Sequence, residues 1–144
     1  MKRAILLIVT MVFTIGGLSV VEAGKKEPIK IGAIFDLTGG GADEGQESYN
    51  AAVLAAKERK EILGHPIKLY VGDAPSASAA ITETKRLITT KNVLCILGTT
   101  LVDNARAVPP ICQKYGVPVL EDDWDYILTE QGWKRYFMIG QTYD

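Results

Sequence analysis

The stretch that most constrains the fold is Lys30 to Gln46, with the sequence KIGAIFDLTGGGADEGQ. It opens with the apolar run Ile31 to Phe35 and continues into a glycine-rich turn, and apolar residues at helical spacing begin only after Asp43. This order is typical of a β-strand that leads through a loop into a helix. Ligands of open parallel sheets bind beyond the carboxyl ends of the strands, so the turn from Asp36 to Gly45 is the first candidate for a functional site.

The alternation of strands and helices continues along the chain. Further strands are predicted at 67–71, 93–97, 116–120 and 136–139. The run 93–97 is apolar throughout, which indicates a central strand covered on both faces. Right-handed crossovers between parallel strands then predict an α/β fold, an open doubly wound parallel sheet. No helical pattern follows 136–139, so we expect the chain to be a truncated part of a larger fold.

The first helix is predicted to extend to Leu63 and to end at the turn 64–66, which contains the sole histidine, His65. One histidine, with both cysteines on regular elements, gives neither a Cys/His zinc site nor a Ser-His-Asp triad. The sequence therefore predicts no catalytic residues and no metal ligands among these types.

The next two helices have recognisable starts. Pro75 and Ser76 open the second one. The third is predicted to use Asp103 or Asn104 as its cap. The dipeptide 109–110, two prolines within the third helix, predicts a kink or a late start.

Residues 1–23 are predicted to be a signal peptide. A basic start precedes the apolar run 4–21, and the small residues of Val21-Glu22-Ala23 favour cleavage after Ala23. An uncleaved membrane anchor is the alternative, since about 18 residues just span a bilayer, but two central glycines disfavour it. The mature chain 24–144 is then a periplasmic or secreted unit of one modest domain.

The composition excludes a nucleic-acid surface. Lysine and arginine number 16 and aspartate and glutamate 17, for a net charge of −1, and no basic run occurs. Cys95 and Cys112 could be bridged in an oxidising compartment. Two buried small hydrophobes are favoured, because a helix packed on a sheet usually holds its Cα atoms beyond the roughly 7 Å that a disulfide tolerates.

Two motifs each allow a functional interpretation and a purely structural one. The run 39–41 is glycine throughout but lacks the G-x-G-x-x-G spacing of nucleotide sites, so it more plausibly allows a wide turn close to a ligand. The loop 121–125 contains four acids and could chelate calcium, but it lacks the spacing of a calcium loop and is otherwise a solvated acidic turn.

Taken in order, the segments resemble the solute-binding proteins of ABC importers, in particular the Leu/Ile/Val-binding and amide-binding type, which are type I periplasmic binding proteins. The matching segments are IKIGAIFDLTGGGADEGQESYNAAVLAA, PIKLYVGDAPSASAAITETKRLI, VLCILGTT and GVPVLE. The resemblance implies two hinged lobes that close on a small ligand without chemistry. This sequence matches the signal peptide and, over 24–144, part of the N-terminal lobe.

The implied function is extracytoplasmic capture of a small polar solute, which is amino-acid-like, an amide or an amine, for uptake through an ABC importer permease. The resemblance implies no enzyme activity and no cofactor. Alternatives are a ligand-sensing ectodomain of the same fold, an exported Rossmann-type enzyme, and the non-functional product of a truncated gene.

The resemblance also implies three ligand loops, at 38–45, 98–103 and 121–125. In the first, Glu44 stands where an aromatic residue often shields the ligand, and in the second Val102 stands at the place of a serine. Small or hydroxyl-bearing residues are usual in the third loop, which is acidic here. The ligand-binding residues implied in this way are Glu44, Thr99, Thr100, Val102, Asp123, Trp124 and Asp125.

The acidic third loop leads us to expect a ligand with a positive group or hydrogen-bond donors, rather than a plain branched-chain amino acid. One like-charge contact at about 4 Å and an effective dielectric of about 20 costs on the order of 4 kcal/mol. Trp124 would give a cation an apolar surface. The alternative is that Asp123 and Asp125 face solvent, where screening leaves little effect.

Overall fold

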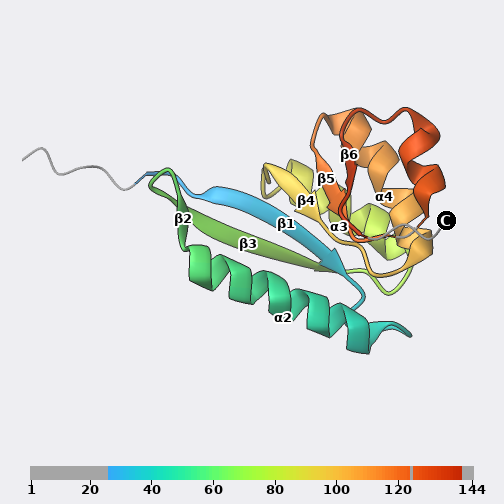
Figure 1. Ribbon diagram of the computed structural model, residues 1–144, viewed down its shortest axis with the longest axis horizontal. Helices are drawn as coiled ribbons and strands as arrows, with labels where there is room; N and C mark the ends of the chain where they lie inside the picture. The colour runs from blue at the N-terminus through green and yellow to red at the C-terminus, as the bar shows by residue number, and fades with distance from the viewer. Residues whose placement is uncertain (1–25, 124, 141–144) are drawn as a thin grey trace, which may run out of the picture.

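The chain forms an α/β structure, which the computed structural model describes for residues 26–123 and 125–140 (Figure 1). The strands in this part are β1 (Ile29–Phe35), β2 (Glu61–Ile62), β3 (His65–Asp73), β4 (Cys95–Leu97), β5 (Val119–Glu121) and β6 (Tyr136–Met138). They form one sheet in the order β2-β3-β1-β4-β5-β6, with only the β2–β3 pair antiparallel. Strands β3 and β2 lie on one side of β1, and β4, β5 and β6 lie on the other. This order confirms the predicted open doubly wound arrangement.

The helices cover the two faces of the sheet unequally. They are α2 (Ala42–Arg59), α3 (Ala77–Thr89), α4 (Val102–Tyr115) and the 3-10 helix η1 (Tyr126–Gln131). Figure 1 shows α2 lying along β1 and β3. The other face is covered by α3 and α4. The predicted start of α3 is confirmed, because the Ser76 side chain accepts a hydrogen bond from the Ala79 N–H at 3.3 Å.

The core lies between the sheet and the α3–α4 pair. Ile34 and Ile96 from adjacent strands and Leu87 from α3 are fully buried there. A Cβ atom on Gly32 would lie 2.7 Å from Ile96 Cδ1 and 3.2 Å from Leu87 Cδ1. Glycine at this strand position therefore lets these two side chains pack directly onto the backbone of β1.

The face of the sheet that carries α2 is only partly covered. Phe137 on β6 is 51% exposed and Ile139 just after it is 58% exposed. Apolar surface is thus left open near these residues. Leu54 on α2 is also exposed, at 56%. Apolar side chains of α2, of β6 and of the segment after β6 are therefore exposed to solvent.

The end of the first helix differs from the prediction. The helix α2 stops at Arg59, and a short hairpin pairs Ile62 with His65. The hairpin turn has positive φ at Leu63 (53°) and Gly64 (78°), as a tight two-residue turn requires. His65 is thus a strand residue and not a turn residue, and its Nδ1 lies 2.8 Å from the Glu27 carbonyl oxygen.

The start of the third helix also differs. Helix α4 begins at Val102, after an N-cap residue, Leu101, that makes no side-chain cap, so the predicted caps and the predicted late start are wrong. The Asn104 amide instead donates to the Ala74 carbonyl at 2.8 Å, which ties α4 to the end of β3. The prolines 109–110 lie within the helix.

The predicted central strand is confirmed in position but is shorter. Residues 95–97 form β4, between β1 and β5, while Leu94 is 65% exposed. The next strand is shifted towards the carboxyl end relative to the prediction and includes Glu121 as its last residue. Glu121 is fully buried and Asp123 and Asp125 are also buried, so the interpretation of 121–125 as a solvated acidic turn is wrong for these three residues.

Candidate functional site

The glycine-rich turn after β1 is held by two aspartates at the carboxyl ends of adjacent strands. The Asp36 carboxylate accepts hydrogen bonds from the N–H groups of Gly39 at 2.6 Å and Gly41 at 2.7 Å. The Asp73 carboxylate accepts one from the Thr38 hydroxyl at 2.6 Å, and this bond lowers the pKa of Asp73. The turn is therefore pre-ordered by strand-end carboxylates, which the sequence interpretation did not assign to this role.

Two glycines bring the neighbouring segments close to the end of β1. A Cβ on Gly45, in the first turns of α2, would lie 1.7 Å from the Asp36 carbonyl oxygen. Gly98, just after β4, has φ of 118°, and a Cβ there would lie 2.0 Å from the Ile34 carbonyl oxygen. Only glycine permits either approach, so both positions shape the edge of the sheet where a ligand would bind.

The loop after β4 provides two hydroxyl groups at this edge. The Thr100 Oγ1 accepts a hydrogen bond from the Asp36 N–H at 3.2 Å, which leaves the hydroxyl proton for another acceptor. The buried Thr99 hydroxyl donates to the Leu101 carbonyl at 3.3 Å and keeps acceptor capacity. Together they offer a donor and an acceptor beside the start of α4.

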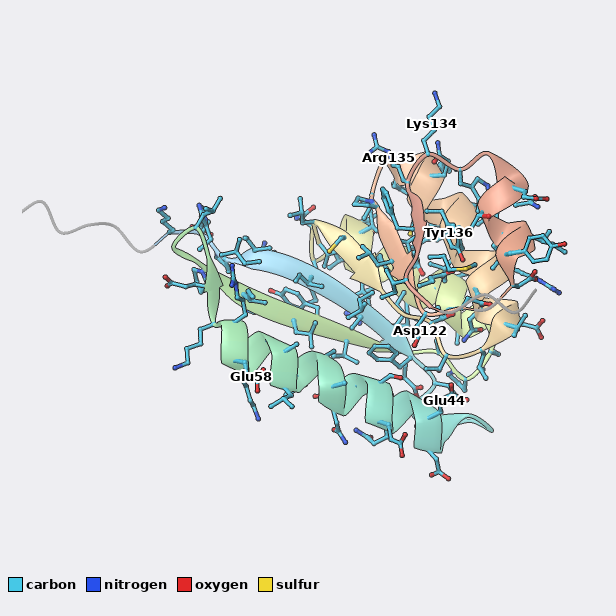
Figure 2. The ribbon with its side chains drawn as sticks, in the orientation of Figure 1. Glu44, Glu58, Asp122, Lys134, Arg135 and Tyr136 are labelled. Carbon is cyan, nitrogen blue, oxygen red and sulfur yellow. The ribbon has the colours of Figure 1, made fainter. Side chains whose placement is uncertain are left out.

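A cavity of about 310 Å³ lies between these loops and the first turns of α2. Its floor is apolar and includes Phe35, Leu97 and Ile139, and small alanine side chains of α2 form one wall. The polar residues that line it are Glu44, Ser48, Thr99, Thr100 and Asp122. In Figure 2, Glu44 and Asp122 lie at the same end of the sheet, one on α2 and one after β5.

The cavity brings together three of the residues implied by the resemblance, namely Glu44, Thr99 and Thr100. Val102, Asp123 and Asp125 are not among its lining residues, and Trp124 lies outside the described residues. Asp122 and Ser48 were missed. Ser48 stands one helical turn after Glu44 on α2, and this spacing was the available signal.

The carboxylates of Asp123 and Asp125 bond within their own region. Asp123 Oδ1 accepts from the Asp125 N–H at 2.8 Å. Asp125 Oδ2 pairs with Arg106 of α4 at 2.9 Å, and its Oδ1 accepts from the Ile127 N–H at 3.3 Å at the start of η1. These contacts give both side chains a role in fixing the loop, with the charge of Asp125 offset by a guanidinium.

Glu121 is the most perturbed acid of the described residues. Glu121 is fully buried on the α4 side of the sheet, and neither of its carboxyl oxygens has a hydrogen-bond partner among the described residues. Burial raises its pKa to about 9, with a further rise from the charge of Asp123 and a small opposing effect of the nearby Tyr136 hydroxyl. Burial and the charge of Glu121 also raise the pKa of Tyr136. At neutral pH Glu121 is therefore a neutral carboxylic acid in the folded chain.

Both cysteines are free thiols, as the favoured interpretation expects, but only Cys112 is buried, whereas Cys95 is half-buried. Burial raises the pKa of Cys95, and burial together with the charge of Glu121 raises the pKa of Cys112 to about 12. Thiols with raised pKa values stay protonated at neutral pH and are poor nucleophiles.

Within residues 26–123 and 125–140, no cluster of three or more histidine, cysteine, aspartate or glutamate side chains has the geometry to hold a metal ion. Over the same residues, the structure contains no helix with the length and apolar character needed to cross a membrane.

Comparison with known proteins gives a consistent set of matches. The family model described as "Periplasmic binding protein" matches residues 28–144. "Leu/Ile/Val-binding protein homolog 7" of Brucella suis biovar 1 (strain 1330) is 34% identical over 96 residues, which cover 65% of this chain and 24% of that protein.

Solved structures match as well. The leucine binding protein LivK of Thermotoga maritima MSB8 is 25% identical with a TM-score of 0.75, covering 79% of this chain and 33% of that one. The substrate binding protein LivJ of a branched-chain amino acid transporter from Streptococcus pneumoniae, solved with isoleucine, is 26% identical with a TM-score of 0.77, covering 81% and 34%. The chain thus spans about a quarter of the Brucella protein and about a third of each solved chain.

Proposed function

Because the chain belongs to the periplasmic binding protein family, we propose that it captures a small polar solute outside the cytoplasm for uptake through an ABC importer. The solute is amino-acid-like, an amide or an amine. The observation that carries this proposal is the cavity at the carboxyl ends of β1 and β4, where the turn held by Asp36 and the hydroxyls of Thr99 and Thr100 meet. In doubly wound sheets this edge is where ligands bind.

Capture takes place by lobe closure and not by chemistry. In this chain the cavity is open to solvent, whereas tight ligand sites bury roughly 70 to 90% of a small molecule's surface. A second lobe closing over the same edge would complete the burial. Residues 24–144 are then part of the N-terminal lobe, and the importer permease is the partner that receives the solute.

No catalytic step is part of this proposal. The cavity's polar groups are hydroxyls and carboxylates, with no cysteine or histidine among the residues that line it. The described cysteines have raised pKa values, so neither is an activated nucleophile. The Thr99 hydroxyl donates its proton to the Leu101 carbonyl and not to a base, which suits hydrogen bonding rather than nucleophilic attack.

Uptake by intact cells tests the proposed function. Deleting the coding sequence should abolish high-affinity uptake of at least one solute in a panel of labelled amino acids, amides and amines. Reintroducing the gene should restore it. Unchanged uptake of every solute in the panel would contradict the proposal.

We further propose that residues 1–23 are a signal peptide removed after Ala23. The basic start, the apolar run 4–21 and the small residues before the cut support this. N-terminal sequencing of the exported protein should therefore begin at Gly24. A chain recovered from the membrane fraction with Met1 still in place would show that the segment is an anchor instead.

A further inference from the structure

We propose that the cavity selects solutes that carry a protonated amine on a small apolar body, and that Asp122 and Glu44 set this preference. The inference rests on the proposed function and specifies the solute class of the same site. The sequence analysis attributed a preference for a positively charged ligand to Asp123 and Asp125. The structure attributes it to Asp122 and Glu44 instead.

The direction of the Asp122 side chain follows from its place in the chain. Glu121, the last residue of β5, points to the α4 side, where it is fully buried. Successive side chains along an extended strand point to opposite faces. Asp122 is accordingly turned to the α2 side, where it is exposed and lines the cavity. A Cβ on Gly140 would lie 2.6 Å from Asp122 Oδ1, so the carboxylate rests against the backbone at Gly140.

Glu44 supplies the second carboxylate from the opposite wall of the cavity. It lies in the first turn of α2, is exposed, and lines the same cavity as Asp122 (Figure 2). Because the two acids stand on different elements, a cation placed between them would be attracted by both. Two carboxylates at one small cavity also disfavour an anionic group there.

Within the part of the chain that the structure describes, no positive charge cancels this pair, because no lysine or arginine there lines the cavity. The ion pairs of the described residues join Arg86 to Glu83 and Arg106 to Asp125. Asp125 is therefore compensated, whereas Glu44 and Asp122 take part in neither pair and remain available to a cationic ligand.

The rest of the cavity suits the apolar part of such a ligand. Phe35, Leu97 and Ile139 form an apolar floor, and the volume of about 310 Å³ accommodates a short aliphatic chain or a single ring. The Thr99 hydroxyl, which donates to the Leu101 carbonyl, can still accept a hydrogen bond from an ammonium group. The carboxylates of Glu44 and Asp122 and the apolar floor together favour a ligand that is an amine with a small hydrophobic body.

Benzylamine, benzyl alcohol and benzoate test this inference, because they share one ring and differ in charge. They are titrated at pH 7 into the 15N-labelled chain purified from cells that export it, and amide shifts are followed by NMR. Benzylamine should shift the amides of Glu44, Thr99 and Asp122 saturably, and benzyl alcohol should bind about fivefold more weakly or worse. Benzoate should produce no saturable shift.

Substitution of the two acids tests whether they cause the preference for benzylamine. Asp122→Asn and Glu44→Gln should each weaken benzylamine binding about fivefold, and the double variant about twentyfold. Glu130→Gln is the matched control, an exposed acid on η1 outside the cavity lining, and should leave binding unchanged. The HSQC spectrum of each variant shows whether it retains the fold.

Three results would overturn the inference: benzoate binding as tightly as benzylamine, no effect of Asp122→Asn, or no shift of these amides by any probe. None of these three binding results affects the uptake experiment, so the proposed function is tested independently of this inference. If deletion of the gene abolishes uptake of an anionic or uncharged solute only, the proposed function holds and the amine preference is refuted.

Discussion

Gly45→Ala is expected to lower the free energy of unfolding by more than about 3 kcal/mol, at the upper end of overpacking effects. The new Cβ would lie 1.7 Å from the Asp36 carbonyl oxygen. This neighbour is backbone at the end of a buried strand, so no side-chain rotation relieves the contact. Helix α2 must move away from β1, and urea unfolding followed by circular dichroism should show the loss.

Gly40→Ala provides a matched control for this prediction. It makes the same substitution in the same glycine-rich turn, but nothing lies within 4 Å of the added Cβ. Its effect on the unfolding midpoint should be small. Equal midpoints for Gly45→Ala and the unmodified chain would mean that α2 does not pack against Asp36 as described.

Glu121→Gln is expected to stabilise the chain by as much as about 3 kcal/mol at pH 7. The folded chain holds Glu121 as a neutral acid with a pKa of about 9, compared with 4.5 for the ordinary side chain. At pH 7 the unfolded chain releases this proton, so folding has to take it up again. Glutamine has nearly the same shape and no proton to recover, which removes the cost.

The same reasoning gives the pH dependence of the folding stability. Below pH 4.5 the Glu121 carboxyl is protonated in both the folded and the unfolded chain, so it adds no pH dependence to the stability. Between 4.5 and 9 only the folded state holds the proton, so the stability of the unmodified chain should fall by about 1.4 kcal/mol for each pH unit. Above pH 9 the loss is complete, because the carboxyl is then charged in both states.

Urea unfolding at several values of pH from 4 to 9 measures this difference. The curves for Glu121→Gln and the unmodified chain should converge near pH 4 and separate as the pH rises. Glu130→Gln, an exposed acid on η1, should follow the unmodified chain throughout. Parallel curves for Glu121→Gln and the unmodified chain would show that Glu121 is not held neutral in the fold.

Gly45 and Glu121 also connect the fold to the candidate site. Gly45 allows α2 to approach β1 closely, and α2 carries Glu44 into the cavity wall. Glu121 ends the strand that presents Asp122 to the other side of the sheet. Substitutions that disturb either packing contact are therefore expected to alter the cavity as well as the stability.

The sequence by itself determined the doubly wound class of the sheet and the order of its strands and helices, except for the short strand β2, which was expected to be helical. These depend on local periodicity, turn residues and the handedness of crossovers, which a single sequence contains. The turn 36–45 was indicated by the apolar strand before it and by its glycines. The ligand loops at 38–45 and 98–103, and with them Glu44, Thr99 and Thr100, were located through the family resemblance, and these three residues line the cavity.

Only the tertiary structure decided which acid of the 121–125 loop lines the cavity. The sequence shows four acids in five positions, and a one-residue difference in where β5 ends reverses the face to which each one points. Pairing of β5 with β4 and β6 buries Glu121, and Asp125 finds Arg106 on α4, a residue 19 positions away in the chain. Asp122 is left facing the cavity because these long-range contacts fix the register, and no local pattern encodes them.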